Sequence, residues 1–132
     1  MVLQINSQGS ILTIDLDAIA YNYRLLKEKA SPAKTAAVVK ANAYGLGVER
    51  IAPLLQMVGC RTFFVATLDE AIQLRLILPK ADIHVFNGIL PGWPGVMIES
   101  NLRPVLNSVE QINLWLKHAG KLETPLLPDL HI

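Results

Sequence analysis

The chain has 132 residues, of which 52% are apolar and 17% are charged, a composition that excludes intrinsic disorder and implies a buried core. The formal net charge is +1 and no run of either sign occurs, which excludes a surface built for nucleic acid or anionic lipid. Cys60, the single cysteine, cannot form an internal disulfide, and we find neither a signal-peptide pattern nor a membrane-spanning apolar stretch. We therefore expect a soluble cytoplasmic protein.

The first elements expected along the chain are a strand and a helix. Residues 11–16 predict a strand that has no helix before it, so we assign residues 1–16 to a segment that pairs outside the main domain. Asp17 is the candidate N-cap of a helix from Ala18 to about Ala30. A second helix is expected over residues 47–58, where Pro53 should kink it or shift its start.

From residue 35 onward, short and nearly continuous apolar runs alternate with amphipathic stretches, as expected for strands covered on both faces. The runs lie at 35–41, 62–66, 82–87, 103–107 and 126–132. Capping boxes are predicted at Thr67 with Glu70 and at Ser108 with Gln111, and Pro79 should end the first of these two helices. Residues 91–95 predict a turn with at most a short helix after it.

This alternation predicts an α/β fold of parallel βαβ units. Periodicity alone leaves open a doubly wound sheet or part of a (β/α)₈ barrel. A complete barrel needs about 250 residues, so in the second case roughly half of it would be missing. An incomplete barrel leaves open sheet edges and apolar faces that favour association.

Lys40 stands at the end of the first apolar run. Side chains alternate between faces along a strand, so Lys40 should share a face with Ala36 and Val38. A lysine is usually a solvated surface charge, but catalytic groups of barrels lie at the carboxyl ends of the strands. The amine of lysine can both bond to an aldehyde cofactor and move a proton, and Tyr44 adds a hydroxyl close in sequence. The residues therefore favour a site without identifying its reaction.

The run VVKANAYGLG at residues 38–47 resembles the pyridoxal-phosphate attachment signature of alanine racemases. Further similarity to that family lies in IDLDAI at 14–19, FVATLDEA at 64–71, RPVL at 103–106 and LHI at 130–132. The resemblance implies that residues 17–132 are the N-terminal portion, about four to five βα units, of a pyridoxal-phosphate-binding (β/α)₈ TIM-type barrel. It also implies that the strand within residues 1–16 pairs with a C-terminal β domain.

The resemblance further implies roles. Lys40 would hold pyridoxal 5'-phosphate as an internal aldimine and act as the base on one face of alanine, interconverting L-alanine and D-alanine for peptidoglycan. Val38 and Tyr44 match positions of the cofactor pocket, and Phe86 stands where the family often has leucine against the pyridine ring. Leu46 replaces a histidine that many members have. The second base, a tyrosine of the partner subunit in a homodimer, and most phosphate ligands would follow residue 132, so the chain is expected to be a truncated or fragmentary racemase, inactive alone.

Three alternatives stay open at this point. The chain could belong to another amino-acid racemase or a decarboxylase on the same barrel, to a non-catalytic pyridoxal-phosphate-binding barrel protein, or to an inactive remnant. His84, His118 and His131 lack metal-ligand spacing, so we expect structural roles for them and no metal site.

Overall fold

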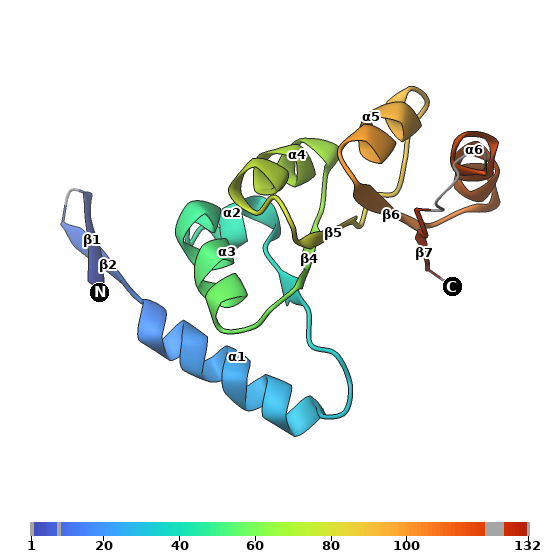
Figure 1. Cartoon of the computed structure of the whole chain (residues 1–132). Helices are drawn as coiled ribbons and strands as arrows, with labels where there is room; N and C mark the ends of the chain where they lie inside the picture. The colour runs from blue at the N-terminus through green and yellow to red at the C-terminus, as the bar shows by residue number, and fades with distance from the viewer. Residues whose placement is uncertain (1, 8, 121–125, 132) are drawn as a thin grey trace.

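The computed structural model describes residues 2–7, 9–120 and 126–131. Its first two strands, β1 (Val2–Ser7) and β2 (Ser10–Asp15), form an antiparallel hairpin that extends away from the remainder of the molecule (Figure 1). β2 confirms the strand expected near residues 11–16, whereas β1 was not predicted. The assignment of this segment to the neighbourhood of a second domain stays a prediction.

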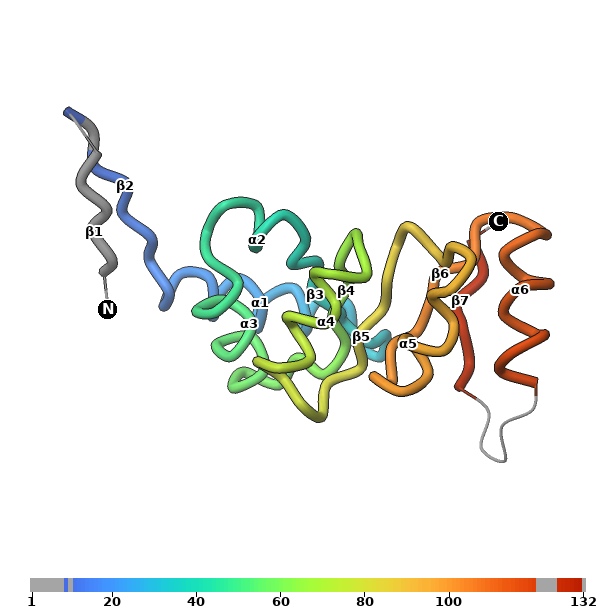
Figure 2. The backbone as a smooth tube through the Cα atoms, turned by 90° about the horizontal axis from the view of Figure 1, so that it is seen from above, coloured from blue at the N-terminus to red at the C-terminus, as the bar shows by residue number. Residues whose placement is uncertain are grey.

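The remainder is a series of βα units. Its elements are α1 (Leu16–Ala30), β3 (Ala37–Val38), α2 (Lys40–Tyr44), α3 (Val48–Met57), β4 (Thr62–Val65), α4 (Leu68–Ile77), β5 (Asp82–Val85), α5 (Trp93–Glu99), β6 (Leu102–Leu106), α6 (Val109–Ala119) and β7 (Asp129–Leu130). Strands β3 to β7 form one parallel sheet in chain order, and the units succeed one another across the molecule (Figure 2). The predicted α/β fold of parallel units is therefore confirmed.

The two faces of this sheet differ in burial. One row of paired residues, Ala37, Phe63, Ile83 and Leu102, is at most 8% exposed and belongs to the core that includes residues of α3, α4, α5 and α6. These helices follow one another along one side of the sheet (Figure 1). The neighbouring row on the other face is formed by Val38, Phe64, His84 and Arg103. We call it the open face, because Val38 is 40% exposed and the ring of Phe64 is only half-buried.

Helix starts follow local hydrogen bonding, and two of the predicted ones need correction. Asp17 does not cap α1: Asp15 does, and its carboxylate accepts bonds from the N–H groups of Asp17 and Ala18 at 2.9 and 3.0 Å. The cap lies earlier because β2 pairs through Asp15 and the chain turns directly into the helix. The box expected at Ser108 is not reciprocal, since the side chain of Gln111 accepts from the N–H of Asn107 instead.

Two prolines were expected to affect helices. Pro53 has less effect than predicted, and Pro79 has the predicted effect. Pro53 lies inside α3 and neither ends the helix nor shifts its start, which remains at Val48. Helix α4 ends at Ile77, just before Pro79, as predicted. Helix α5 is short, seven residues, but it begins at Trp93, inside the segment that was expected to be a turn.

Candidate functional site

Lys40 lies at the carboxyl end of the first parallel strand. The ladder between β3 and β4 continues to the preceding residue, because the N–H of Val39 donates to the carbonyl of Phe64 at 2.9 Å. Val38 pairs with Phe64, and Phe64 pairs with His84. β3 ends at Val38, and the backbone of Val39, with φ of −125° and ψ of 23°, already turns into α2, which begins at Lys40. The face that Lys40 shares with Val38 therefore stays a prediction.

The predicted cofactor residues come from three places. Val38 pairs with Phe64 on the open face, and the ring of Phe86 stacks on that of Phe64 with centroids 4.9 Å apart. Lys40 is half-buried, and within the described ranges its amine has neither a hydrogen bond nor an ion pair. Tyr44 lies apart from the sheet, in α2, and is 61% exposed. The structure thus places Val38 and Phe86 on one face of the sheet, with Lys40 and the phenol of Tyr44 in the adjoining turn.

The turn that follows Lys40 is left-handed. Ala41, Asn42 and Ala43 have φ of 50–54° and ψ of 47–50°, and Tyr44 has φ of 55°. A non-glycine residue in this conformation costs about 1–2 kcal/mol, so four in succession require strong support from outside the segment. Gly45 and Gly47 follow with φ of 83° and 92°, so residues with side chains take most of the positive-φ backbone in this run.

Hydrogen bonds within the segment tie this turn to α3. The N–H of Ala43 donates to the carbonyl of Val39 at 3.0 Å, and the N–H of Gly47 donates to that of Asn42 at 3.0 Å. The side-chain oxygen of Asn42 also accepts from the N–H of Val48, the first residue of α3, at 2.8 Å. Asn42 therefore acts as a capping residue for α3, although it lies five residues before the N-cap position of that helix. This role of Asn42 was not predicted from the sequence.

A carboxylate from α4 holds the other side of the turn. Oε1 of Glu70 accepts from the N–H of Ala41 at 2.7 Å, and Oε2 accepts from the N–H groups of Ala66 and Thr67 at 2.8 and 3.3 Å. With the bond from the N–H of Glu70 to Oγ1 of Thr67, this completes the predicted capping box. The box was predicted correctly, but the bond to Ala41 was missed, because nothing local in the sequence relates residues 29 positions apart.

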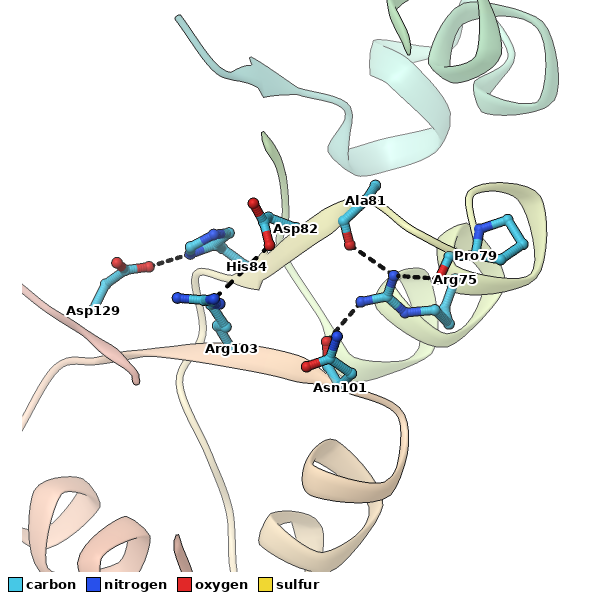
Figure 3. A network of polar contacts seen from close by, with 8 residues as sticks. All are labelled: Arg75, Pro79, Ala81, Asp82, His84, Asn101, Arg103 and Asp129. Atoms are coloured by element: carbon cyan, nitrogen blue, oxygen red, sulfur yellow. Dashed lines mark hydrogen bonds and ion pairs between the residues drawn. The ribbon is translucent and has the colours of Figure 1, made fainter. Parts of the chain in front are cut away.

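Farther from Lys40, the open face carries a polar network (Figure 3). His84 is buried, stacks on Phe64 with ring centroids 4.6 Å apart, and bonds through Nδ1 to the carboxylate of Asp129 on β7. The guanidinium of Arg103 lies 3.8 Å from the carboxylate of Asp82. The stacking and the pairing show how this histidine contributes to the packing of the sheet.

The other two histidines make single polar contacts. Nδ1 of His118 lies 2.9 Å from the carbonyl of Leu114, one turn earlier in α6, and Nδ1 of His131 lies 3.0 Å from Oδ1 of Asn107. Within residues 2–7, 9–120 and 126–131, no group of three or more His, Cys, Asp or Glu side chains could hold a metal ion. Over the same ranges, none of the helices has the length and apolarity that crossing a membrane requires.

Comparison with known proteins gives concordant matches. The family model "Alanine racemase, N-terminal domain" matches residues 14–132. Alanine racemases of Methylobacterium sp. (strain 4-46) and Brucella ovis are 51% and 48% identical to the chain over 124 and 115 residues, which is 94% and 86% of this chain. These matches cover 34% and 29% of the two enzymes, so the chain spans about a third of the length of these relatives.

Solved structures agree with this placement. The alanine racemase of Bartonella henselae, described with covalently bound pyridoxal phosphate, superposes with a TM-score of 0.78 at 45% identity, covering 82% of this chain and 30% of that one. A histidine racemase from Leuconostoc mesenteroides also superposes, with a TM-score of 0.72 at 27% identity, covering 80% of this chain and 28% of that one. The parallel sheet of βα units thus matches the N-terminal part of the alanine racemase barrel.

Proposed function

The chain belongs to the alanine racemase N-terminal domain family, and from that premise we propose that it supplies the cofactor-bearing lysine, Lys40, of a pyridoxal-phosphate-dependent alanine racemase. The observation that carries the proposal is the position of Lys40: half-buried, at the carboxyl end of β3 and two residues after Val38. Catalytic groups of barrel enzymes occupy that end of the strands.

The residues present fit the cofactor. A planar aromatic aldehyde needs an amine to hold it and apolar surface to lie against. Lys40 has no polar partner within the described ranges that would compete for its amine, and Val38 and Phe86 offer apolar surface on the same face. Lys40 would hold the group through Nζ, with Val38, Phe86 and the hydroxyl-bearing Tyr44 around it. When bound, pyridoxal phosphate supplies an electron sink that stabilises negative charge at the α-carbon of an amino acid.

The lysine would contribute the proton chemistry on one side of the substrate. Nζ of Lys40 would accept a proton from the α-carbon of one enantiomer of alanine and would donate it in the reverse direction, which is general acid–base catalysis by a positioned side chain. The rings of Phe64 and Phe86, which stack on each other, would exclude water from one side of the cofactor. Racemisation also needs a proton donor on the opposite side, and we propose that it comes from the partner subunit of a homodimer.

The substrate is proposed to be alanine, since the curated relatives at 48–51% identity bear that name, whereas the histidine racemase is 27% identical. Cytoplasmic D-alanine synthesis for peptidoglycan would be the role of the whole enzyme. The buried free thiol of Cys60 suits a reducing compartment.

A labelling experiment tests the cofactor assignment. The chain is incubated with pyridoxal phosphate, reduced with borohydride to make any lysine–pyridoxyl bond permanent, and digested for peptide mass spectrometry. We expect the label on the peptide containing Lys40 and its loss in Lys40→Arg, with Lys29, an exposed lysine of α1, as the matched position. Label spread evenly over exposed lysines would contradict the assignment.

A chimera tests the activity. Residues 14–132 replace the corresponding segment of the Brucella ovis enzyme, and the formation of D-alanine from L-alanine is measured. We expect racemisation by the chimera, none by its Lys40→Arg variant and none by the 132-residue chain alone. An active Lys40→Arg chimera would refute the role of Lys40, and full activity of the chain alone would refute its dependence on further residues.

A further inference from the structure

Glu70 connects the segment after Lys40 to the neighbouring βα unit. Its two carboxylate oxygens accept from different parts of the chain: Oε1 from the N–H of Ala41, and Oε2 from the N–H groups of Ala66 and Thr67. Ala41 follows β3 and Ala66 follows β4, so one side chain bridges the carboxyl ends of two adjacent strands. We propose that Glu70 is a positioning residue, which fixes Lys40 in the site by holding the first amide of the left-handed turn.

The bond to Ala41 lies directly beside the lysine. Ala41 is the next residue in the chain, and its left-handed backbone sets the direction in which the chain leaves β3. The 2.7 Å distance is short for a bond from an N–H, as expected when the acceptor is ionised. Anchoring this amide fixes the peptide plane that Lys40 shares with Ala41, and with it the start of the lysine side chain.

Packing does not replace this bond. A cavity of about 360 Å³ lies beside the turn, where α2, α3 and α4 meet, and its lining includes Ala41, Asn42 and Glu70. Ala41 and Asn42 are themselves exposed. Side-chain packing around the turn is therefore incomplete, and the tie between the turn and α4 depends on the carboxylate. The cap of α4 uses only Oε2 of the Glu70 carboxylate, so Oε1 is free to accept from Ala41.

This inference rests on the proposed function of Lys40, and three variants separate the two. Glu70→Gln keeps the size of the side chain but turns one acceptor into an NH₂ donor, so it cannot accept at both ends. Glu70→Asp keeps the charge and shortens the reach. Asp69→Asn is the matched control, because Asp69 is an exposed carboxylate in the same first turn and makes no bond to residues 40–44 within the described ranges.

Two measurements follow. Amide hydrogen exchange reports the Ala41 N–H without any cofactor. Labelling by pyridoxal phosphate and borohydride reports the rate at Lys40 relative to Lys80, an exposed lysine. In both Glu70 variants we expect about tenfold faster exchange at Ala41 and about tenfold slower labelling of Lys40, the effect of one lost charged hydrogen bond. Asp69→Asn should match the parent chain in both.

The outcomes are distinguishable. If the parent chain is not labelled at Lys40, the proposed function fails, while the exchange at Ala41 still tests the bridge. If Lys40 is labelled at the parent rate in Glu70→Gln and Glu70→Asp, with unchanged circular dichroism, the positioning role is overturned. Normal labelling in Glu70→Asp with slow labelling in Glu70→Gln would replace the bridge by a simple effect of charge. Should Glu70→Gln lose its fold, Glu70→Asp decides between these results.

Discussion

The imidazole of His84 on β5 bonds to the carboxylate of Asp129 on β7, across the strand that separates them (Figure 3). The contact ties the short strand β7 to a strand two places away, and it gives the buried polar ring of His84 a partner. Leaving such a group without its partner costs free energy, because it has lost its water as well.

Asp129→Ala should therefore lower the free energy of unfolding by about 1–3 kcal/mol, the cost of an unsatisfied buried polar group. Urea denaturation followed by circular dichroism measures the change. Glu99→Ala is the control, because Glu99 is exposed at the end of α5 and makes no side-chain hydrogen bond within the described ranges. Equal losses in the two variants would show that the His84 contact contributes nothing specific.

Tyr23 predicts how stability depends on pH. Burial, with the neighbouring thiol of Cys60 adding to it, raises the pKa of Tyr23 from 10.0 to about 12. Its hydroxyl donates to the carbonyl of Thr35 at 3.0 Å, which also requires the protonated phenol. Because the folded pKa is the higher one, this contribution to stability is complete below pH 10 and is lost as the pH rises towards about 12.

We expect the free energy of unfolding to fall between about pH 10 and pH 12, with a late component in the tyrosinate absorbance titration of the folded chain. Tyr23→Phe should remove that component and flatten the fall, whereas Tyr21→Phe, at an exposed position of the same helix, should retain both. A late component that survives in Tyr23→Phe would assign it to another residue.

Arg75 joins the end of α4 to two loops. Its guanidinium donates to five backbone carbonyls, among them those of Ala81 at 2.7 Å and Asn101 at 2.6 Å (Figure 3). A lysine ammonium cannot reproduce this fork, so Arg75→Lys should cost about 2 kcal/mol in urea denaturation. Arg50→Lys, at an exposed position of α3 that has no side-chain bond within the described ranges, should be neutral. A neutral Arg75→Lys would mean that water replaces these bonds.

In the left-handed turn, substitution by glycine is expected to have an unusual effect on stability. Ala41→Gly removes a Cβ that is strained at φ of 50°, so it should stabilise the chain by up to about 1 kcal/mol or leave it unchanged. The same substitution in a right-handed helix, Ala18→Gly in α1, should destabilise it by about 0.5–1 kcal/mol. Urea denaturation of the two variants gives the comparison, and a loss of stability at both positions would contradict the strain at Ala41.

Much of the fold could be predicted because its signals are local. Continuous apolar runs mark the strands, and the pair Thr67 and Glu70 marks the start of α4 through bonds between residues three apart. The cap of α1 was misplaced by two residues, since Asp15 and Asp17 are equally suited and only the pairing of β2 decides between them.

The site could be predicted only in part. Strand alternation locates Val38 on the open face, and the stacking on Phe64 adds Phe86, whereas the roles of these residues and of Lys40 stay predictions. The left-handed turn could not be predicted, because alanine and tyrosine have no local preference for positive φ. It is supported by the bond that the N–H of Ala41 donates to Glu70, far away in sequence, and by the side chain of Asn42, and neither kind of support leaves a pattern in a single sequence.

The order of the strands in the sheet has a consequence for how the chain acquires its structure. Since every strand from β3 to β7 pairs with its neighbour in sequence, each new unit emerging from the ribosome meets an edge that is already formed. Paired residues of neighbouring strands lie 19 to 26 positions apart, so each pairing costs less loop-closure entropy than pairing strands that are distant in sequence. We expect the helix-covered face to assemble first during synthesis, while the open face, on which Lys40 is predicted to lie, stays exposed to water until later.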